Sequence, residues 1–227
     1  MERNVLVLGD GLLGSEIVKQ TGWEYISRKK GDFDINDLDT LKGYIPEVIV
    51  NCIGNTNTYS NDKESHWDIN YKFVSNLIQF CNINEIKLIH ISTDYLYTNS
   101  VNNASETDIP IHGENWYSYT KLLSDGLVQL QSNDYLICRC GHKPQPFIYD
   151  KAWSDQIGNF DYVFDISKLI VILINKGASG VYNVGTEIKS MYNLASRTKK
   201  NVGKTKAPKS APKDITMNLN KLNDGLA

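Results

Sequence analysis

The chain has 227 residues, of which 41% are hydrophobic and 22% charged, so it is long enough to bury a sizeable core. Its formal net charge of -2 gives no general attraction to nucleic acid or to an anionic membrane surface. No apolar run reaches the length of a membrane span, about 18 residues, and nothing at the start reads as a signal peptide, so we expect a cytoplasmic protein. The four cysteines lack metal-ligand spacing, so we expect no metal and interpret them as small buried side chains: Cys52, Cys81, Cys138 and Cys140.

The first predicted strand, residues 5–8, runs directly into the glycine pattern Gly9-x-Gly11-x-x-Gly14 and a predicted helix over 11–20. Glycines let a backbone approach a ligand closely, and a helix N-terminus favours anionic oxygens. The pattern therefore predicts a turn that holds a dinucleotide pyrophosphate, although alone it is a weak signal.

Short apolar runs continue to alternate with helical patterns through the first two thirds of the chain. The predicted strands are 23–27, 32–35, 48–52, 86–92 and 135–139, and the predicted helices are 37–44, 64–81 and about 115–131, the last preceded by a polar loop over 98–114. This alternation predicts an α/β fold, with a doubly wound parallel sheet of the Rossmann type covered by helices on both faces. Ligands bind such sheets at the carboxyl ends of the strands.

The rhythm changes after Arg139. Residues 141–159 contain two prolines and predict a loop, followed by a helix over 165–176 capped by Asp165. The remaining predictions are a strand over 180–184, a helix over 190–200, a lysine- and proline-rich mobile linker or strap over 199–213 and a last short element over 215–222. We therefore predict a dinucleotide-binding domain over 1–140, with 155–185 returning to its sheet, and a small substrate-binding portion made of 141–154 and 186–227.

Tyr117 and Lys121 lie four residues apart on a predicted helix, so an acid and a cation share one face and can converge on one bound reactant. A free tyrosine has a pKa near 10, so a neighbouring cation is needed to favour the phenolate at neutral pH. Together with Thr93, this pair makes a redox site the leading hypothesis. The alternative is a buried tyrosine and a lysine whose stem lies along an ordinary helix.

The order and spacing of several segments resemble one family. The chain resembles the extended short-chain dehydrogenases/reductases, and most closely the branch of the dTDP-4-dehydrorhamnose reductases. The matching segments are VLGDGLLGSEI at 7–17, FDIND at 33–37, NCIGNT at 51–56, DINYKF at 68–73, ISTDYLY at 91–97, ETDIP at 106–110, YSYTK at 117–121 and DQIGNFDYVFDIS at 155–167.

The resemblance implies a role for each candidate catalytic residue. Thr93 hydrogen-bonds the substrate oxygen, and Tyr117 protonates the sugar ketone as hydride arrives from the nicotinamide. Lys121 tunes the phenol and reaches the nicotinamide ribose. The implied cofactor contacts begin with the glycine turn, which consists of Gly9, Gly11, Leu12, Leu13 and Gly14. Asp34 and Ile35 border the adenine, and Cys52, Ile53 and Gly54 lie along the dinucleotide. The other implied contacts are Tyr117, Lys121 and, near the nicotinamide, the stretch from Cys140 to His142. For His142, a hydrogen-bonding or exposed residue is favoured over a catalytic base.

The turn after the second strand bears on cofactor choice. A carboxylate there would accept both ribose hydroxyls of NAD, but the chain offers Ser27, Arg28 and Lys29, which suit a 2′-phosphate. We therefore expect NADP(H), with NAD(H) and a merely solvated basic turn as the alternatives.

Two departures from the family affect the function. Ser118 replaces a glycine, and the stretch between Arg139 and Asp155 lacks a substrate-capping helix and strand, so the lid is small, missing or supplied by a partner. We expect a reductase of a nucleotide-linked 4-keto-6-deoxy sugar, favoured by the intact set of Thr93, Tyr117 and Lys121. The alternatives are a nucleotide-sugar epimerase or dehydratase and a non-catalytic NADP-binding regulatory subunit, which the reduced lid favours.

We also expect a homodimer, because two predicted helices are apolar on more than one stripe and family members pair these helices. The residues are Tyr71, Phe73, Val74, Leu77, Ile78 and Phe80 on one helix and Trp116, Tyr119, Leu122, Leu123, Leu127 and Leu130 on the other.

Overall fold

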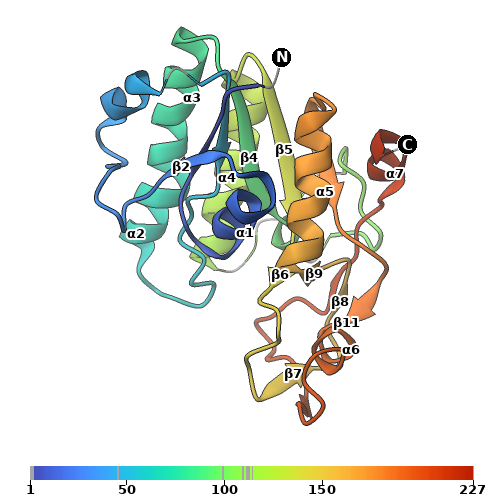
Figure 1. Cartoon of the computed structure of the whole chain (residues 1–227). Coiled ribbons are helices and arrows are strands. Elements are labelled where there is room, and N and C mark those ends of the chain that lie inside the picture. The colour runs from blue at the N-terminus through green and yellow to red at the C-terminus, as the bar shows by residue number, and fades with distance from the viewer. Residues whose placement is uncertain are drawn as a thin grey trace.

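The computed structural model describes residues 3–44, 46–98, 100–108, 110, 113 and 115–226. Its centre is a six-stranded sheet in the order β10-β5-β4-β3-β1-β2, with every neighbouring pair parallel (Figure 1). The strands are β1 (Val5–Leu8), β2 (Glu24–Ile26), β3 (Val48–Asn51), β4 (Lys87–Thr93), β5 (Tyr135–Cys140) and β10 (Gly180–Val184). The chain moves from β1 to β2 on one side and then to β3 on the other, so the predicted doubly wound α/β fold is confirmed.

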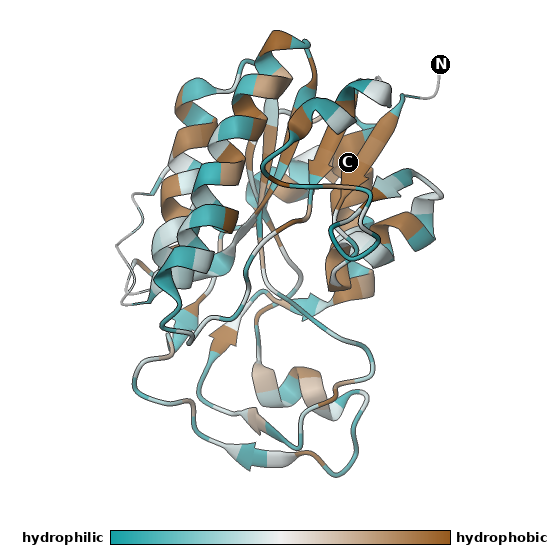
Figure 2. Ribbon diagram, turned by 90° about the vertical axis from the view of Figure 1, so that its left-hand side faces the viewer, coloured by the Kyte–Doolittle hydropathy of each residue, from teal (hydrophilic) through white to brown (hydrophobic). Residues whose placement is uncertain are grey.

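Helices cover both faces of this sheet because its strands are apolar on both sides. Val5 and Val7 pack with helices α1 (Leu12–Thr21) and α5 (Val163–Asn175). Leu6 and Leu8 point the other way and pack with α3 (Phe73–Ile83) and α4 (Trp116–Gln131). Figure 2 shows the apolar strands between the two helical layers. Their carboxyl ends open toward one edge of the sheet.

Two elements between β2 and α3 differ from the prediction. Residues 32–35 form turns with an isolated bridge between Asp34 and Asp37, so the predicted strand is wrong. The reason is local, because the Asp34 carboxylate accepts a hydrogen bond from the Asn36 main-chain nitrogen and competes with strand pairing. The following helix is a 3-10 helix, η1 (Leu38–Gly43), and its N-cap residue Asp37 accepts from the Asp39 nitrogen.

The long helix predicted over 64–81 consists of three consecutive parts. Helix α2 (Lys63–Trp67) continues into η2, a π-helical turn over Asp68–Lys72, and then into α3. Directly before the predicted polar loop over 98–114, the segment Asp94–Tyr97 forms a 3-10 helix, η3. Residues 99, 109, 111, 112 and 114 of that loop, one of which belongs to the ETDIP segment, lie outside the described residues, as do 1, 2 and 227 of the predicted domain ranges.

The predicted loop over 141–159 is wrong, because it contains three short strands. These are β6 (His142–Lys143), β7 (Lys151–Trp153) and β8 (Ile157–Gly158). Most of their partners come much later in the chain, so no local pattern reveals the pairing. Strand β6 pairs with β9 (Asp161–Tyr162), β7 with β12 (Gly203–Thr205), and β8 with both β11 (Lys189–Ser190) and β13 (Asp214–Ile215).

The later helices begin and end at other residues than predicted. Helix α5 starts at Val163, with Tyr162 rather than Asp165 as N-cap; Asp165 instead lies in the first turn, where its charge favours the helix dipole. Helix α6 (Met191–Ser196) is shorter than predicted and is capped by Ser190, which accepts from the Asn193 nitrogen. Helix α7 (Asn220–Leu226) replaces the predicted last short element and packs beside β10.

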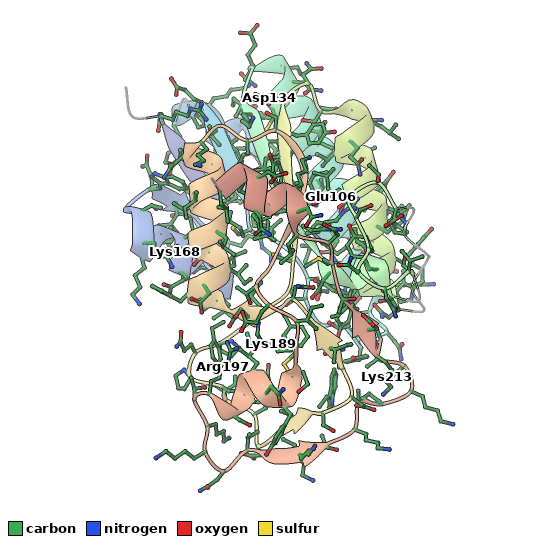
Figure 3. All side chains as sticks on the ribbon, turned by 90° about the vertical axis from the view of Figure 1, so that its right-hand side faces the viewer. Glu106, Asp134, Lys168, Lys189, Arg197 and Lys213 are labelled. Carbon is green, nitrogen blue, oxygen red and sulfur yellow. The ribbon has the colours of Figure 1, made fainter. Side chains whose placement is uncertain are left out.

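For residues 199–213 the linker alternative is wrong, because this segment carries β12 and buries apolar side chains. Together with β7, β8, β11, β13 and α6 it builds a small lobe at the carboxyl edge of the sheet (Figure 1). The lobe has its own core, formed by Phe147, Ala152, Phe160, Tyr162, Met191, Leu194, Ala195, Val202 and Ile215. Figure 3 labels Lys189 and Arg197 where the lobe meets the sheet, and Lys189 forms a buried ion pair of 3.0 Å with Asp161. The domain boundaries themselves stay predictions.

Candidate active site

The glycine turn lies between the carboxyl ends of β1 and β3, the point where the strand order reverses. Gly9 has a φ of 99°, a conformation that L side chains rarely adopt. A Cβ atom on Gly14 would lie 2.0 Å from the Gly9 carbonyl oxygen, so only glycine lets α1 pack against this turn. At Gly11, the N-cap of α1, a Cβ would meet nothing within 4 Å, which leaves the helix N-terminus open to an approaching ligand.

Most of the predicted site residues meet around one cavity of about 340 Å³ at this edge of the sheet. Its lining includes the α1 N-terminus, the segment after β3, the end of β4, the first turns of α4 and the end of β5. The predicted residues that line it are Gly11, Leu12, Leu13, Cys52, Ile53, Gly54, Thr93, Tyr117, Lys121, Cys140 and His142.

Tyr117 lies in the first turn of α4 and lines the cavity. Asn115 caps this helix by accepting from the Ser118 nitrogen at 2.9 Å, and the Ser118 hydroxyl hydrogen-bonds the same side chain, which accommodates the departure from the family glycine. Burial raises the pKa of Tyr117, a hydrogen bond with Thr93 opposes the rise, and the charge of Asp94 adds to it. The phenol is therefore neutral, the form that can donate a proton.

Lys121 is buried one turn further along α4. Its ammonium donates to the Ile91 carbonyl oxygen at 2.6 Å and lies 3.3 Å from Nε2 of His90. Burial lowers the pKa of Lys121 to about 8, against the opposing charges of Asp125, Cys140 and Cys52. We predicted that Lys121 supplies a charge beside the phenol and reaches the nicotinamide ribose; in the structure its ammonium contacts β4, and both roles stay predictions.

Arg28 is the residue of the predicted specificity turn that lines a hollow. This second hollow, of about 460 Å³, is also lined by Phe33 and Asp34. Ser27 is fully buried, where its hydroxyl accepts from the Lys30 nitrogen and its own nitrogen donates to Asp32. Lys29 projects outward with its side chain 76% exposed.

Two further predicted contacts, Ile35 and His142, differ in their surroundings. Ile35 packs against the hydrophobic core under α3. His142 lines the main cavity, and burial together with the Lys143 charge lowers its pKa to about 4. An imidazole of such low basicity does not favour a catalytic base, and its buried Nδ1 atom has no hydrogen-bond partner within the described residues.

Cys81, Cys138 and Cys140 are buried, as predicted, whereas Cys52 is partly exposed at the cavity. All four are free thiols. Within the described residues no group of three metal-ligating side chains occurs, and no helix is long and apolar enough to cross a membrane.

Sequence reasoning missed a third cavity, of about 490 Å³, which adjoins the first through shared residues such as Tyr95 and Lys143. Aromatic and basic side chains line it: Tyr59, Tyr95, Phe147, Tyr149 and Trp153, with Lys143 and Lys151. Several of them belong to the predicted loop, and the density of aromatic residues and lysine in FIYDKAW at 147–153 is the signal that was available. The lobe thus lines a hollow that is continuous with the first cavity.

Sequence reasoning also missed the network that anchors α4. In the π-helical turn η2, the Asn70 side chain donates to the Thr120 hydroxyl at 3.1 Å and to the Asn55 carbonyl oxygen at 3.1 Å. It therefore ties the segment after β3 to the helix that carries Tyr117 and Lys121. π-helical turns occur often at functional sites.

The fold and the site define a Rossmann-type α/β protein with a Thr-Tyr-Lys set beside a dinucleotide-type glycine turn. The family described as "RmlD substrate binding domain" matches residues 3–142, so the chain belongs to this family.

Comparison with known proteins gives relatives of the same kind. The chain is 27% identical over 221 residues to "Spore coat polysaccharide biosynthesis protein SpsK" of Bacillus subtilis (strain 168), covering 84% of this chain and 76% of that protein. It is 25% identical over 215 residues to "dTDP-4-keto-6-deoxy-D-glucose reductase" of Streptomyces niveus, covering 83% and 74%. The solved dTDP-4-dehydrorhamnose reductase of Bacillus anthracis, in complex with NADP, superposes with a TM-score of 0.83 at 22% identity, covering 98% of this chain and 91% of that chain. This last likeness establishes the fold.

Proposed function

We propose that the protein is an NADP(H)-dependent oxidoreductase that reduces the ketone of a nucleotide-linked 4-keto-6-deoxy sugar. The observation that carries the proposal is the convergence of Thr93, Tyr117 and Lys121 on a cavity that continues to the open N-terminus of α1. A regulatory subunit needs a dinucleotide turn but has no chemical need for all three side chains.

The residues around the cavity fit the cofactor. The exposed backbone at Gly11 and the α1 N-terminus suit a pyrophosphate, and the Arg28 guanidinium suits a 2′-phosphate through two charge-assisted hydrogen bonds. Lys121 would hold the nicotinamide ribose. When bound, NADPH supplies the hydride. NAD(H) remains the alternative cofactor, since an Asp34 carboxylate shares the hollow with Arg28.

The protein groups then manage the proton and the substrate oxygen. Thr93 hydrogen-bonds the oxygen, and Tyr117, kept neutral by burial, donates its proton to that oxygen as the ketone is reduced. The neutral phenol matches this direction, because an acid must be protonated before the reaction. Reprotonation of Tyr117 afterwards draws on solvent at the cavity mouth.

The neighbouring cavity fits the nucleotide part of the substrate. Aromatic rings such as Trp153 and Tyr149 offer faces for a base, and the ammonium groups of Lys143 and Lys151 suit a diphosphate. The names of the relatives point to the same substrate class and to polysaccharide precursor synthesis. A nucleotide-sugar epimerase or dehydratase would use the same cavities, so the identity of the sugar product and the consumption of NADPH separate these activities.

The test is a panel of nucleotide-linked 4-keto-6-deoxy sugars incubated with the purified full chain and NADPH. We expect loss of NADPH absorbance with a member of the panel and a reduced sugar by mass spectrometry. Isomerised sugar without NADPH consumption would assign an epimerase. Tight NADPH binding with no turnover of any member would favour the regulatory subunit.

We also propose a homodimer, now on narrower grounds than the sequence offered. The apolar residues of α3, including Phe73 and Leu77, are buried in the core of the chain itself, so they are not available to a partner. What supports pairing is the exposure of Ile83 (81%) at the end of α3 and of Leu130 (85%) in the last turn of α4. Light scattering at micromolar concentration should give twice the 25.7 kDa chain mass, and a monomer mass would contradict the proposal.

A further inference from the structure

An imidazole lies buried under the candidate catalytic lysine. His90 belongs to β4, is fully buried, and points to the same face of the sheet as Leu88, toward α4. Its Nε2 atom lies 3.3 Å from the Lys121 ammonium and 3.4 Å from the Ser124 hydroxyl. Its Nδ1 atom has no hydrogen-bond partner within the described part of the chain. An apolar side chain would fill this position without the free-energy cost of a buried nitrogen that has no hydrogen-bond partner. The need to fill space therefore does not explain why a histidine occupies it.

The charge next to His90 decides which ring nitrogen carries the proton. Burial and the Lys121 charge lower the pKa of His90 well below its usual value, so the ring is neutral and has one donor and one acceptor nitrogen. An N–H at Nε2 would point at an ammonium only 3.3 Å away, which is repulsive. The lone pair therefore lies at Nε2 and the proton at Nδ1.

We propose that His90 is a positioning residue for Lys121: its Nε2 accepts a hydrogen bond from the ammonium and, with the Ile91 carbonyl, holds it against β4 at the edge of the cavity. An ammonium has three N–H donors, so these two contacts leave one for a ligand. Ser124 lies beside this pair: its hydroxyl is 3.4 Å from Nε2 of His90 and donates to the Lys121 carbonyl oxygen at 3.1 Å.

The hydrogen bond favours the charged form of Lys121, so losing it lowers the pKa of that lysine. The titratable groups facing Lys121 are Asp125 from α4, His90 from β4, Cys140 from β5 and Cys52 from the segment after β3. Only His90 both lies within hydrogen-bond distance of the ammonium and is neutral, so its replacement removes an acceptor without removing a charge.

The first experiment observes the hydrogen bond in the protein alone and does not depend on the proposed function. Histidine labelled with ¹⁵N in the full chain should show His90 protonated at Nδ1 and unprotonated at Nε2. The Nε2 resonance should shift as Lys121 loses its proton, at a pH of about 8, and this shift should vanish in Lys121→Met. A His90 ring protonated at Nε2, or a titration that persists in Lys121→Met, would overturn the proposal.

The second experiment separates positioning from structural support, and it rests on the proposed function. In His90→Leu, turnover and NADPH affinity should fall about tenfold above pH 8 yet change less than about twofold near pH 6.5, where Lys121 stays charged. His90→Gln places an acceptor where Nε2 was and should restore the alkaline values. If both variants lose activity equally at every pH, in step with a lower melting temperature, His90 is only structural.

Failure of the proposed function gives a different pattern from failure of this inference. If no nucleotide sugar is turned over, NADPH binding measured across the same pH range still compares His90→Leu with His90→Gln. Protonation of His90 at Nδ1, together with a pH-dependent loss of NADPH binding in His90→Leu, would then support the positioning role even though the protein is not a reductase. A wild-type reductase whose His90→Leu variant keeps the same pH profile would support the function and overturn the inference.

Discussion

The guanidinium of Arg139 and the carboxylate of Asp125 meet in two hydrogen bonds of 2.8 and 3.1 Å, with the two side chains 2% and 1% exposed. The same guanidinium donates to the Tyr97 hydroxyl, and Asp125 also accepts from Ser92. The pair therefore joins β5, β4 and α4 one helical turn below Lys121, whose pKa the Asp125 charge raises.

Asp125→Ala should destabilise the protein by about 3–5 kcal/mol, because it leaves the Arg139 charge buried and unpaired. Urea unfolding at neutral pH measures this loss. Asp39→Ala is the matched control, since Asp39 forms an ion pair with Lys42 in which both side chains are exposed, and it should cost about 1 kcal/mol or less. Equal losses in the two variants would mean that burial of the Arg139–Asp125 pair is not what matters.

Tyr117→Phe should lower kcat by roughly 10²–10⁴-fold, the usual contribution of a positioned acid. The change removes one hydroxyl and keeps the ring, which packs edge-on against Tyr95. NADPH affinity should stay within about twofold. Steady-state kinetics and a binding titration give the two values. Full activity in an otherwise active preparation would rule out Tyr117 as the proton donor.

Lys121→Met and Thr93→Val should separate ribose binding from substrate activation. Lys121→Met removes the ammonium but keeps an unbranched stem, and both NADPH affinity and kcat should fall by about tenfold or more. Thr93→Val keeps the β-branched shape at the end of β4 and should reduce turnover while leaving NADPH binding intact. Identical profiles for both variants would contradict the separate roles proposed for them.

Arg28→Ala should weaken NADPH by about tenfold or more and leave NADH nearly unchanged, because the contact we propose for the guanidinium is with the 2′-phosphate, which NADH lacks. Lys29→Ala is the control, since Lys29 projects outward and lies 4.0 Å from Asp10. Fluorescence titration of both cofactors gives the comparison. Equal weakening of NADPH and NADH by Arg28→Ala would place the 2′-phosphate elsewhere.

Lys189→Met should destabilise the junction between sheet and lobe by about 1–3 kcal/mol at pH 7, because buried Asp161 then loses the Lys189 ammonium and keeps the more distant Arg197, at 3.6 Å, as its cation. Burial pushes the pKa of Asp161 up, but hydrogen bonds from Thr186, the Tyr162 nitrogen and Lys189 outweigh it, so the folded pKa lies below the usual value.

The sign of the pH dependence follows from this lowered pKa. The stabilisation by ionised Asp161 is present above the usual aspartate pKa of about 3.9 and is lost as the pH falls through the lower folded value. Urea unfolding should therefore show that the wild type loses more stability than Lys189→Met as the pH falls from about 5 to about 3, the range around the usual aspartate pKa. Parallel losses would mean that Lys189 does not hold the pKa of Asp161 down.

The sequence by itself determined the sheet, both helical layers and the residues at the strand ends. These depend on local properties: apolar runs long enough for a strand, helical periodicity, and glycines at a turn such as Gly9. The carboxyl ends of parallel strands share one edge, so Thr93 at the end of β4 and the segment after β3 had to lie together. The spacing of Tyr117 and Lys121 placed both on one face of α4 for the same local reason.

Only the tertiary structure decided what those residues contact. The lobe depends on strand pairs between segments such as β7 and β12, about fifty residues apart, which no local pattern encodes. The contact between His90 and Lys121 depends on the packing of α4 against β4, because His90 lies on the strand and Lys121 on the helix. The same holds for Ser27, whose position in a basic turn indicated a ligand contact while its packing buried it. Local periodicity specifies which elements form; contacts between distant elements specify the site.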